Sequence, residues 1–243
     1  MIKKDDKSEI NSRDIYKFID EEKFEKCVKT LISRYDVAKK KDFFKNKIDP
    51  FSAIVQMNFQ DKNFDAWEDF EKERQLQKSL QNHIGKFHQD IITNLNDWEK
   101  MEISDAINKK KKIFVEVKNK FNTVTGEKEA RVYDNLASNL KKYPKYKAYY
   151  LYIIRENKYV DEPFTPSDNT KKKSSKKKKR KKRQDLRKID GVSFYKKITK
   201  DDQFLKKLYT ELFIKLLAIS GKNSFSNIKD DDRFNEFFKK TFD

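Results

Sequence analysis

The stretch MEISDAINKKKKIFVEVKNKFNT, residues 101–123, decides how the rest of the chain is organised. In its second half β-branched side chains occupy every other position from 113 to 117, and this period of two predicts a half-buried strand. Glu116 and Lys118 therefore project from the same face of that strand. The short run over residues 103–107 can fold back antiparallel across a lysine-rich turn, which would bring Asp105 near Glu116.

Two carboxylates and one ammonium group then converge at one point of this predicted hairpin. Carboxylate oxygens on a rigid strand pair suit Mg²⁺, and a lysine beside them can orient or help deprotonate a water molecule. The pattern Asp105, Glu116-Val117-Lys118 resembles the PD-(D/E)xK nuclease signature, with Ser104-Asp105 in place of its Pro-Asp. The hairpin is thus a candidate hydrolytic centre.

An acid-x-Lys triplet alone is weak evidence in a chain of which 40% of the residues are charged. The same triplet occurs at residues 5–7 and 21–23, and neither copy lies in a stretch with strand periodicity. Only the strand context separates Glu116 from these copies. The alternative interpretation is an edge hairpin that carries solvated charge.

The composition limits the class of protein. A chain of 243 residues can bury one good core, and its 20 Phe and 11 Tyr supply large side chains for that core. The net charge of +18 favours a polyanionic partner, because a basic surface attracts phosphates and releases counterions on binding. The single Cys27 excludes an internal disulfide, and one cysteine with two histidines argues against a zinc site. No run approaches the roughly 20 apolar residues of a membrane span, so we expect a cytoplasmic protein.

A helical N-terminal region is expected over residues 1–66. Apolar residues recur at helical spacing from Ile15 to about Phe44, whereas Asp49-Pro50 marks a break and residues 51–64 are interpreted as a connecting segment. The clearest helix, or pair of helices in line, covers residues 67–95. Beside its apolar stripe runs a polar stripe of Glu71, Gln75, Lys78, Asn82 and Gln89. Such a stripe is typical of the solvated side of an amphipathic helix.

The second half of the chain predicts a βαβ unit. A helix over residues 127–142 follows the hairpin, and a continuous apolar and aromatic run over residues 148–154 has the length of a strand. Strand, helix and strand in this order place the two strands parallel. We therefore expect an α/β fold whose mixed central sheet is flanked by helices. The core would span residues 67–220, and residues 221–243 would be a C-terminal tail.

A basic insertion interrupts this core at about residues 157–184. Its segment KKKSSKKKKRKKR, residues 171–183, holds 11 Lys or Arg among 13 residues, and like charges at that density predict a disordered arm. The arm would either hold DNA through its phosphates or be a tolerated surface insertion. Residues 186–199 then predict a short strand or hairpin that feeds a helix over residues 201–220.

Several blocks together resemble the type II restriction endonucleases that recognise GGNCC. The blocks are Arg74-Gln75, NHIGKFHQ at residues 82–89, DAIN at 105–108, EVKNKFNT at 116–123 and IDGVSFY at 189–195. The resemblance runs from about residue 71 to residue 219. It implies a restriction-endonuclease-like core of the PD-(D/E)xK superfamily.

This resemblance also implies the chemistry. Such an enzyme hydrolyses phosphodiester bonds of double-stranded DNA with Mg²⁺ as its cofactor. By analogy Asp105, Glu116 and the carbonyl of Val117 would bind Mg²⁺, while Lys118 would activate or position the attacking water. Glu71 would be the helix-borne acidic residue near the metal, with Glu73 as the competing candidate for that position.

The resemblance further suggests DNA-binding residues and partners. The candidates leave the central strand at its DNA-facing end or lie on the flanking helices: Asn119, Lys120, Asn122, Thr123, Arg131, Asn82 and Gln89. Plain solvated charge is the alternative for these residues. A palindromic target implies a two-fold homodimer, and a restriction enzyme implies a cognate DNA methyltransferase in the host.

Two other functions fit the same sequence. One is a different PD-(D/E)xK DNA nuclease, such as a repair or structure-selective enzyme. The other is a basic nucleic-acid-binding protein without catalytic activity, in which Asp105 and Glu116 are ordinary charges. Discrete fragments from a digested DNA would separate a restriction enzyme from both.

Overall fold

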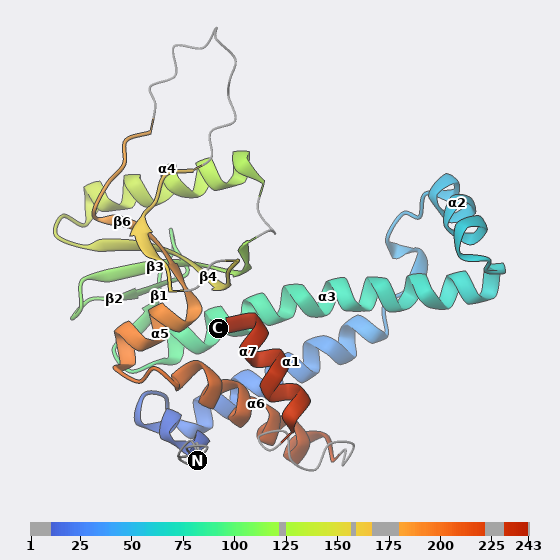
Figure 1. Cartoon of the computed structure of the whole chain (residues 1–243), viewed down its shortest axis with the longest axis horizontal. Helices are drawn as coiled ribbons and strands as arrows, with labels where there is room; N and C mark the ends of the chain where they lie inside the picture. Colours follow the sequence, from blue (N-terminus) through green and yellow to red (C-terminus); the bar gives the residue numbers. More distant parts are fainter. Residues whose placement is uncertain (1–10, 122–124, 157–158, 167–179, 222–230, 243) are drawn as a thin grey trace, which may run out of the picture.

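The computed structural model describes residues 11–121, 125–156, 159–166, 180–221 and 231–242. Within them one mixed sheet has six strands in the order β1-β2-β3-β4-β6-β5 (Figure 1). The strands are β1 (Trp98–Lys100), β2 (Ala106–Asn108), β3 (Ile113–Lys120), β4 (Lys147–Ile154), β5 (Asp161–Pro163) and β6 (Leu186–Asp190). Because β3 pairs parallel with β4 across the intervening helix, the predicted βαβ unit is confirmed.

Helices cover both faces of this sheet. They are α1 (Glu21–Lys39), α2 (Pro50–Gln60), α3 (Phe64–Asn94), α4 (Gly126–Lys142), α5 (Gly191–Thr199), α6 (Phe204–Ser220) and α7 (Asp232–Phe242), with the 3₁₀ turns η1 (Ser12–Lys17) and η2 (Phe43–Lys45). Helix α4 packs on one face, and α5, α6 and the inner half of α3 lie on the other (Figure 1). The predicted α/β architecture with flanking helices is therefore confirmed. None of the helices described has the length and apolarity that a membrane span requires.

Alternation along the central strands sends side chains into two separate clusters. Val115 and Val117 of β3 join the larger cluster, which also contains Ile91 of α3 and Phe194 of α5. Phe114 points the opposite way into the cluster under α4. Because β4 is buried on both faces, its sequence AYYLYII reads as one continuous apolar run and hides this alternation.

The first helices share the large cluster with the sheet. Ile15 and Phe24 are fully buried in it. The backbone of Ile19 bridges that of Leu95 at the end of α3. The Ser12 hydroxyl also donates to the buried Glu211 carboxylate of α6 at 2.8 Å. The N-terminal helical region is thus held to the sheet by side-chain packing and by hydrogen bonds, in addition to the covalent connection.

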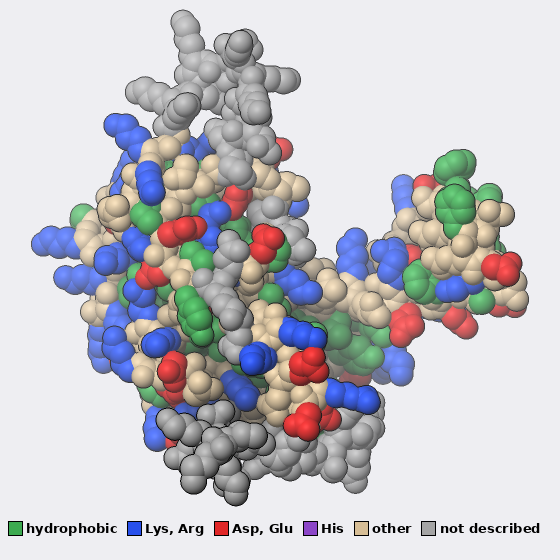
Figure 2. Space-filling view, viewed as in Figure 1, with side chains coloured by type: hydrophobic (Ala, Val, Ile, Leu, Met, Phe, Trp, Pro, Cys, Tyr) green, Lys and Arg blue, Asp and Glu red, His purple; other side chains and the backbone are tan. Residues whose placement is uncertain are grey.

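The outer half of α3 and the helix α2 form an arm that stands out from the body (Figures 1 and 2). The interpretation of residues 51–64 as a connecting segment is wrong, because residues 50–60 form α2. Pro50 occupies the first turn, and the Asp49 carboxylate accepts a hydrogen bond from the Phe51 N–H at 3.0 Å. These are ordinary helix-start signals. Residues 67–94, in contrast, belong to a single helix, α3, and Leu95 is its C-cap.

Three further details differ from the expectations. Residues 191–199 form the helix α5 rather than part of a hairpin, since the Asp190 carboxylate accepts a hydrogen bond from the Ser193 N–H at 2.9 Å and caps it. The strands β1 and β5 extend the two edges of the sheet. Asp105 lies just before β2, in the irregular segment that leads into it.

The basic insertion is ordered where the structure describes it. Residues 157–158 and 167–179 of the predicted disordered range lie outside the described residues. Between them, β5 pairs with β6, and Phe164 is fully buried under α4. After them, Arg180 forms an ion pair with Asp134 of α4 at 2.7 Å. Disorder across the whole of 157–184 is therefore wrong, because residues at both ends of the range pack on the core.

Gly191 is the residue at which we expect substitution to destabilise the fold most clearly. A Cβ atom at this position would lie 2.5 Å from the backbone carbonyl oxygen of Ile153. Gly191→Ala therefore forces β4 and α5 apart, and we expect it to lower the free energy of unfolding by about 1–3 kcal/mol. Chemical denaturation measures this. The matched control is Gly221→Ala after α6, where the added Cβ meets nothing within 4 Å and only the positive φ is strained. Equal stability of Gly191→Ala and wild type would contradict the close approach.

Candidate active site

Asp105 and Glu116 lie opposite each other where β2 meets β3. The antiparallel register pairs Ala106 with Val115. One residue further along each strand, Asp105 therefore lies opposite Glu116. Asp105 is fixed by two hydrogen bonds. Its N–H donates to the Val115 carbonyl at 3.1 Å, and its Oδ2 accepts from the Val117 N–H at 2.7 Å. Because β3 lies inside the sheet, the alternative of a solvated edge hairpin is wrong.

Lys118 completes this group. It points to the same face of β3 as Glu116, and its Nζ lies 2.6 Å from Glu116 Oε1. Both side chains are half-buried. The structure thus brings Asp105, Glu116 and Lys118 together in the arrangement that the sequence predicts. Their catalytic roles stay predictions.

The backbone of Val117 faces the same point. In a strand the N–H and C=O of one residue are directed toward the same neighbouring strand. Since the Val117 N–H reaches Asp105, the Val117 carbonyl also points to the side of β3 on which Asp105 lies. Two carboxylates and one carbonyl can therefore approach one cation.

The electrostatics of Asp105 fit such a site. Burial and the facing Glu116 carboxylate raise the pKa of Asp105 to about 6, against the effects of the Val117 N–H and of Lys118 and Lys86. Two carboxylates that disfavour each other's charge are a donor set that a hard divalent cation would stabilise. In the described part of the chain, no three His, Cys, Asp or Glu side chains are placed so that they could hold a metal ion together. A cation here would thus need a backbone or solvent oxygen as its third ligand.

A basic cavity of about 350 Å³ opens beside this group, between α3 and the end of β3. The residues that line it include Asn82, Lys86, Gln89, Lys118, Asn119 and Lys120. The two elements meet near Gly85 and Asn119, since the Cβ of Asn119 lies 3.8 Å from the place where a Gly85 side chain would begin, which is an ordinary contact distance. The cavity therefore combines amide and ammonium groups next to the paired carboxylates.

This sequence is similar to known proteins over most of its length. The Eco47II restriction endonuclease family matches residues 16–219. The chain belongs to this family. It is 34% identical over 242 residues to the type II restriction enzyme Eco47II of Escherichia coli, which covers 92% of this chain and 97% of that enzyme. It is 27% identical over 202 residues to the type II restriction enzyme Sau96I of Staphylococcus aureus, covering 79% of this chain and 76% of that enzyme.

Membership of the Eco47II family agrees with the site geometry. The chain is a type II site-specific endonuclease with a restriction-endonuclease-like fold. The resemblance proposed from the sequence blocks is confirmed at the level of the family. The matched range includes α3, the central hairpin and the βαβ unit, so it contains every element that builds the candidate site.

Glu71 lies away from this site. Its carboxylate is held by the Arg74 guanidinium at 2.5 and 2.6 Å and by the Gln75 amide at 3.1 Å, and the bond to Arg74 lowers the pKa of Glu71. Glu71 lies about 21 Å along the helix axis from Gly85, the point at which α3 meets β3. The structure therefore does not bring Glu71 to Asp105. Helical spacing predicts a shared face correctly, but only the inner end of that long face reaches the sheet.

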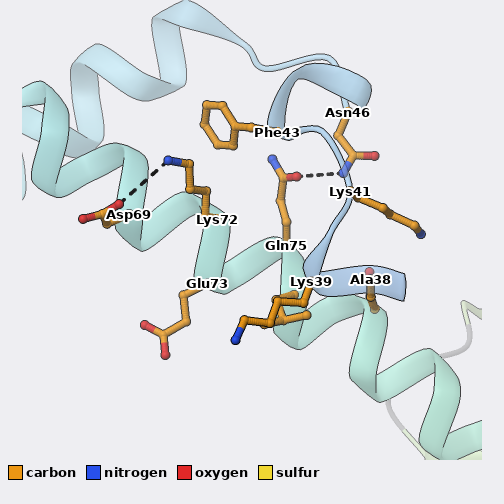
Figure 3. A pocket seen from close by; sticks show the side chains of 11 residues that line it. Ala38, Lys39, Lys41, Phe43, Asn46, Asp69, Lys72, Glu73 and Gln75 are labelled. Carbon is orange, nitrogen blue, oxygen red and sulfur yellow. Dashed lines mark hydrogen bonds and ion pairs between the residues drawn. The ribbon is translucent and has the colours of Figure 1, made fainter. Parts of the chain in front are cut away.

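Glu73, the competitor for that position, is also remote. It lines a second cavity of about 440 Å³ at the base of the arm, where the chain around η2 crosses α3. Figure 3 shows Glu73 directed away from Phe43, while Gln75 Oε1 accepts a hydrogen bond from Asn46 at 2.9 Å. Lys72 in the same cavity pairs with Glu68 and Asp69. Glu73 is thus separated from Asp105 by the length of the helix, as Glu71 is.

The DNA-binding candidates occupy different places. Asn82, Gln89, Asn119 and Lys120 line the basic cavity. Arg131 is exposed on α4, 3.9 Å from Glu127. Asn122 and Thr123 lie outside the described residues. Four of the seven candidates thus share one surface beside Asp105, and the contacts of all seven with DNA stay predictions.

Two features of the site were not found in the sequence. Lys86 follows Asn82 by one helical turn, and its charge lowers the pKa of Asp105. Its spacing on α3 is the signal that could have identified it. On the face of the sheet that carries Glu116 and Lys118, which is the face away from α3, Glu129 of α4 accepts a hydrogen bond from Tyr152 at 3.0 Å and pairs with Lys188 at 2.9 Å. No local pattern links these three residues, which meet only through the parallel pairing of β4 and β6.

Proposed function

We propose that this chain hydrolyses phosphodiester bonds of double-stranded DNA at a short palindromic site, GGNCC, with Mg²⁺ as its cofactor. The observation that carries this proposal is the convergence of Asp105, Glu116 and Lys118 beside a basic cavity. The family names of the relatives support the reaction class, since both are called type II restriction enzymes. The pattern of the three residues supports the PD-(D/E)xK superfamily.

The proposed metal ligands are Asp105, Glu116 and the Val117 carbonyl. All three present oxygen, which is the donor atom that Mg²⁺ requires. The raised pKa of Asp105 supports this assignment, because the carboxylates repel each other until a cation lies between them. When bound, Mg²⁺ would make water a better nucleophile at neutral pH and offset the charge that develops on the phosphate oxygens.

Lys118 is proposed to act on the attacking water. Its ammonium group is held at 2.6 Å from Glu116, so it is positioned on the metal-binding face of β3 rather than in free solvent. It can orient the water and hold or pass on its proton. A positioned group in proton transfer contributes about 10²- to 10⁴-fold to the rate.

DNA is proposed to lie along the basic cavity. Asn82 and Gln89 of α3 would contact the backbone or support the site, and Asn119 and Lys120 lie where β3 leaves the sheet. Lysine can donate to guanine N7 and O6 in the major groove, and asparagine can pair with adenine or contact phosphate. With guanines to recognise, Lys120 and Arg131 are the candidates for base contacts. Asn122 and Thr123 continue the same segment in the sequence.

A palindromic target also implies the assembly and the cellular partner. Two copies related by a two-fold axis would each cut one strand. A host DNA methyltransferase would protect the same site. Both statements follow from the proposed specificity.

Digestion of unmethylated phage DNA tests this function and its metal dependence together. With Mg²⁺ we expect discrete fragments whose ends map to GGNCC, and with EDTA we expect intact DNA. Fragments that map to another fixed sequence would keep the reaction and replace the target. A smear without fixed ends would favour a different nuclease of the superfamily. Intact DNA with every divalent metal tried would favour a basic binding protein, because binding at low salt needs only positive charge.

A further inference from the structure

The helix α2 has the composition of a contact surface. In a chain of which 40% of the residues are charged, its sequence PFSAIVQMNFQ, residues 50–60, is the longest run without Asp, Glu, Lys or Arg. Its large apolar side chains are nevertheless outside the core. Phe51 is 74% exposed, Ile54 is 62% exposed and Phe59 is 84% exposed.

The fold of the single chain does not use this apolar face. Of the α2 residues only Ala53 is buried. Figure 2 shows hydrophobic side chains gathered at the tip of the arm, away from the body. Phe44 and Phe64 on neighbouring parts of the arm are exposed as well. Helix α2 is held to α3 by the buried Ala53 and by the Trp67 indole N–H, which donates to Gln56 at 3.1 Å, and this leaves most of its apolar surface open to a partner.

The charge of the protein indicates which partner fits. With a net charge of +18, two copies repel each other over most of their surfaces. The face of α2 carries no charge, so it is a place where two copies can approach without that repulsion. An uncharged apolar helix is also poorly suited to bind DNA, whose backbone attracts Lys and Arg.

The exposed area agrees with a contact between two copies. The three α2 side chains together with Phe44 and Phe64 present roughly 600 Å² of apolar surface on each copy, since a phenylalanine side chain can bury about 150–250 Å². Specific interfaces bury about 1,200–2,000 Å² in total over both partners. A two-fold contact uses the same patch on both subunits, so two faces of this size reach the lower end of that range.

We propose that α2 is the interface through which two copies of this chain pair, with Phe51, Ile54 and Phe59 at its centre. The inference rests on the proposed function, which requires a two-fold pair, and adds the surface that forms it. Helix α2 is joined directly to α3, whose inner end lines the basic cavity. Pairing at the arms would therefore fix the distance between the two catalytic groups along the DNA.

The test is sedimentation velocity of the full chain over a wide range of concentrations, with wild type, Phe59→Asp and Phe237→Asp. Phe237 is the matched control because it is 68% exposed on α7, away from the arm. We expect wild type and Phe237→Asp to sediment as dimers. Phe59→Asp should raise the dissociation constant by at least about a hundredfold, because both copies bring a carboxylate into an apolar contact. Unchanged circular dichroism would show that Phe59→Asp still folds.

Each other result overturns the proposal in a different way. A wild-type protein that stays monomeric would exclude pairing of two copies through α2, and the exposed face would then bind a different protein. A dimer that Phe59→Asp does not weaken would retain the two-fold pair and place its interface elsewhere. Asp105→Asn, measured in the same series, should dimerise like wild type and fail to cut DNA. This variant separates failure of the interface from failure of the nuclease.

Discussion

Asp105→Asn is expected to slow cleavage of double-stranded DNA by at least about a hundredfold, since the charge of one metal ligand is worth several kcal/mol in the transition state. The asparagine amide oxygen can still accept the hydrogen bond from the Val117 N–H, so the local backbone stays in place. What is lost is the negative charge opposite Glu116. Single-turnover cleavage measures the rate, and binding to the same DNA in EDTA should be unchanged or slightly tighter because one charge that repels phosphate is gone.

The same substitution should lower activity but raise the thermal stability of the metal-free protein. A pKa raised to about 6 means that the folded protein disfavours the ionised Asp105, so above that pH the charge lowers stability. In metal-free buffer well above pH 6, Asp105→Asn should therefore melt at a higher temperature than wild type. Added Mg²⁺ should raise the melting temperature of wild type and leave that of the variant almost unchanged.

Asp97→Asn is the matched control for this prediction. Asp97 carries a carboxylate just before β1 and forms an exposed ion pair with Lys110 at 2.5 Å. It is not part of the candidate site, so its removal should change neither the cleavage rate nor the response to Mg²⁺. Cleavage by Asp105→Asn at the wild-type rate would contradict the metal site and return Asp105 to an ordinary charge.

The convergence of Asp105 and Glu116 could be predicted because it depends on local rules. The period of two fixes which side chains of β3 share a face, and a short turn fixes the antiparallel register with β2. The segment over Asn108–Lys111 is tightened by a hydrogen bond from the Lys111 N–H to the Asn108 side chain at 2.8 Å. Neither step needs information from distant parts of the chain.

The position of Glu71 could not be predicted in the same way. Helical spacing places Glu71, Asn82 and Gln89 on one face of α3, and the structure agrees with that face. How far along the helix the sheet makes contact depends on packing between residues distant in sequence. Helix α3 meets β3 near Gly85 and Asn119, and Glu71 stays on the arm beside Arg74.

Helix α2 was missed for a related physical reason. An amphipathic helix is recognised from an apolar stripe that faces a core, with charges on the other side. Residues 50–60 have no charges to mark a polar side, and their apolar residues face solvent in the single chain. Asp49 and Pro50 are helix-start signals, but a proline after a polar residue equally fits a break in a helix, and only the structure distinguishes the two.

Lys118→Ala is expected to lower the rate of the chemical step by about 10²- to 10⁴-fold, the contribution of a positioned group in proton transfer. DNA affinity should change little, because the ammonium group is already engaged with Glu116 at 2.6 Å. Lys120→Ala is the matched control. It removes the same charge from the same strand, and it should raise the apparent dissociation constant for DNA while the rate on bound DNA is retained. Single-turnover rates at saturating enzyme separate the two effects.

The response of Lys118→Ala to Mg²⁺ distinguishes a role on water from a role in holding the metal. Without the Lys118 charge, Glu116 faces Asp105 with no cation from β3 to balance the pair, so affinity for Mg²⁺ should rise rather than fall. Titration of Mg²⁺ followed by melting temperature measures this. Slow cleavage together with undiminished metal binding would assign Lys118 to the attacking water. Weaker metal binding, or a loss confined to DNA affinity, would assign it to the scaffold of the site or to a phosphate contact instead.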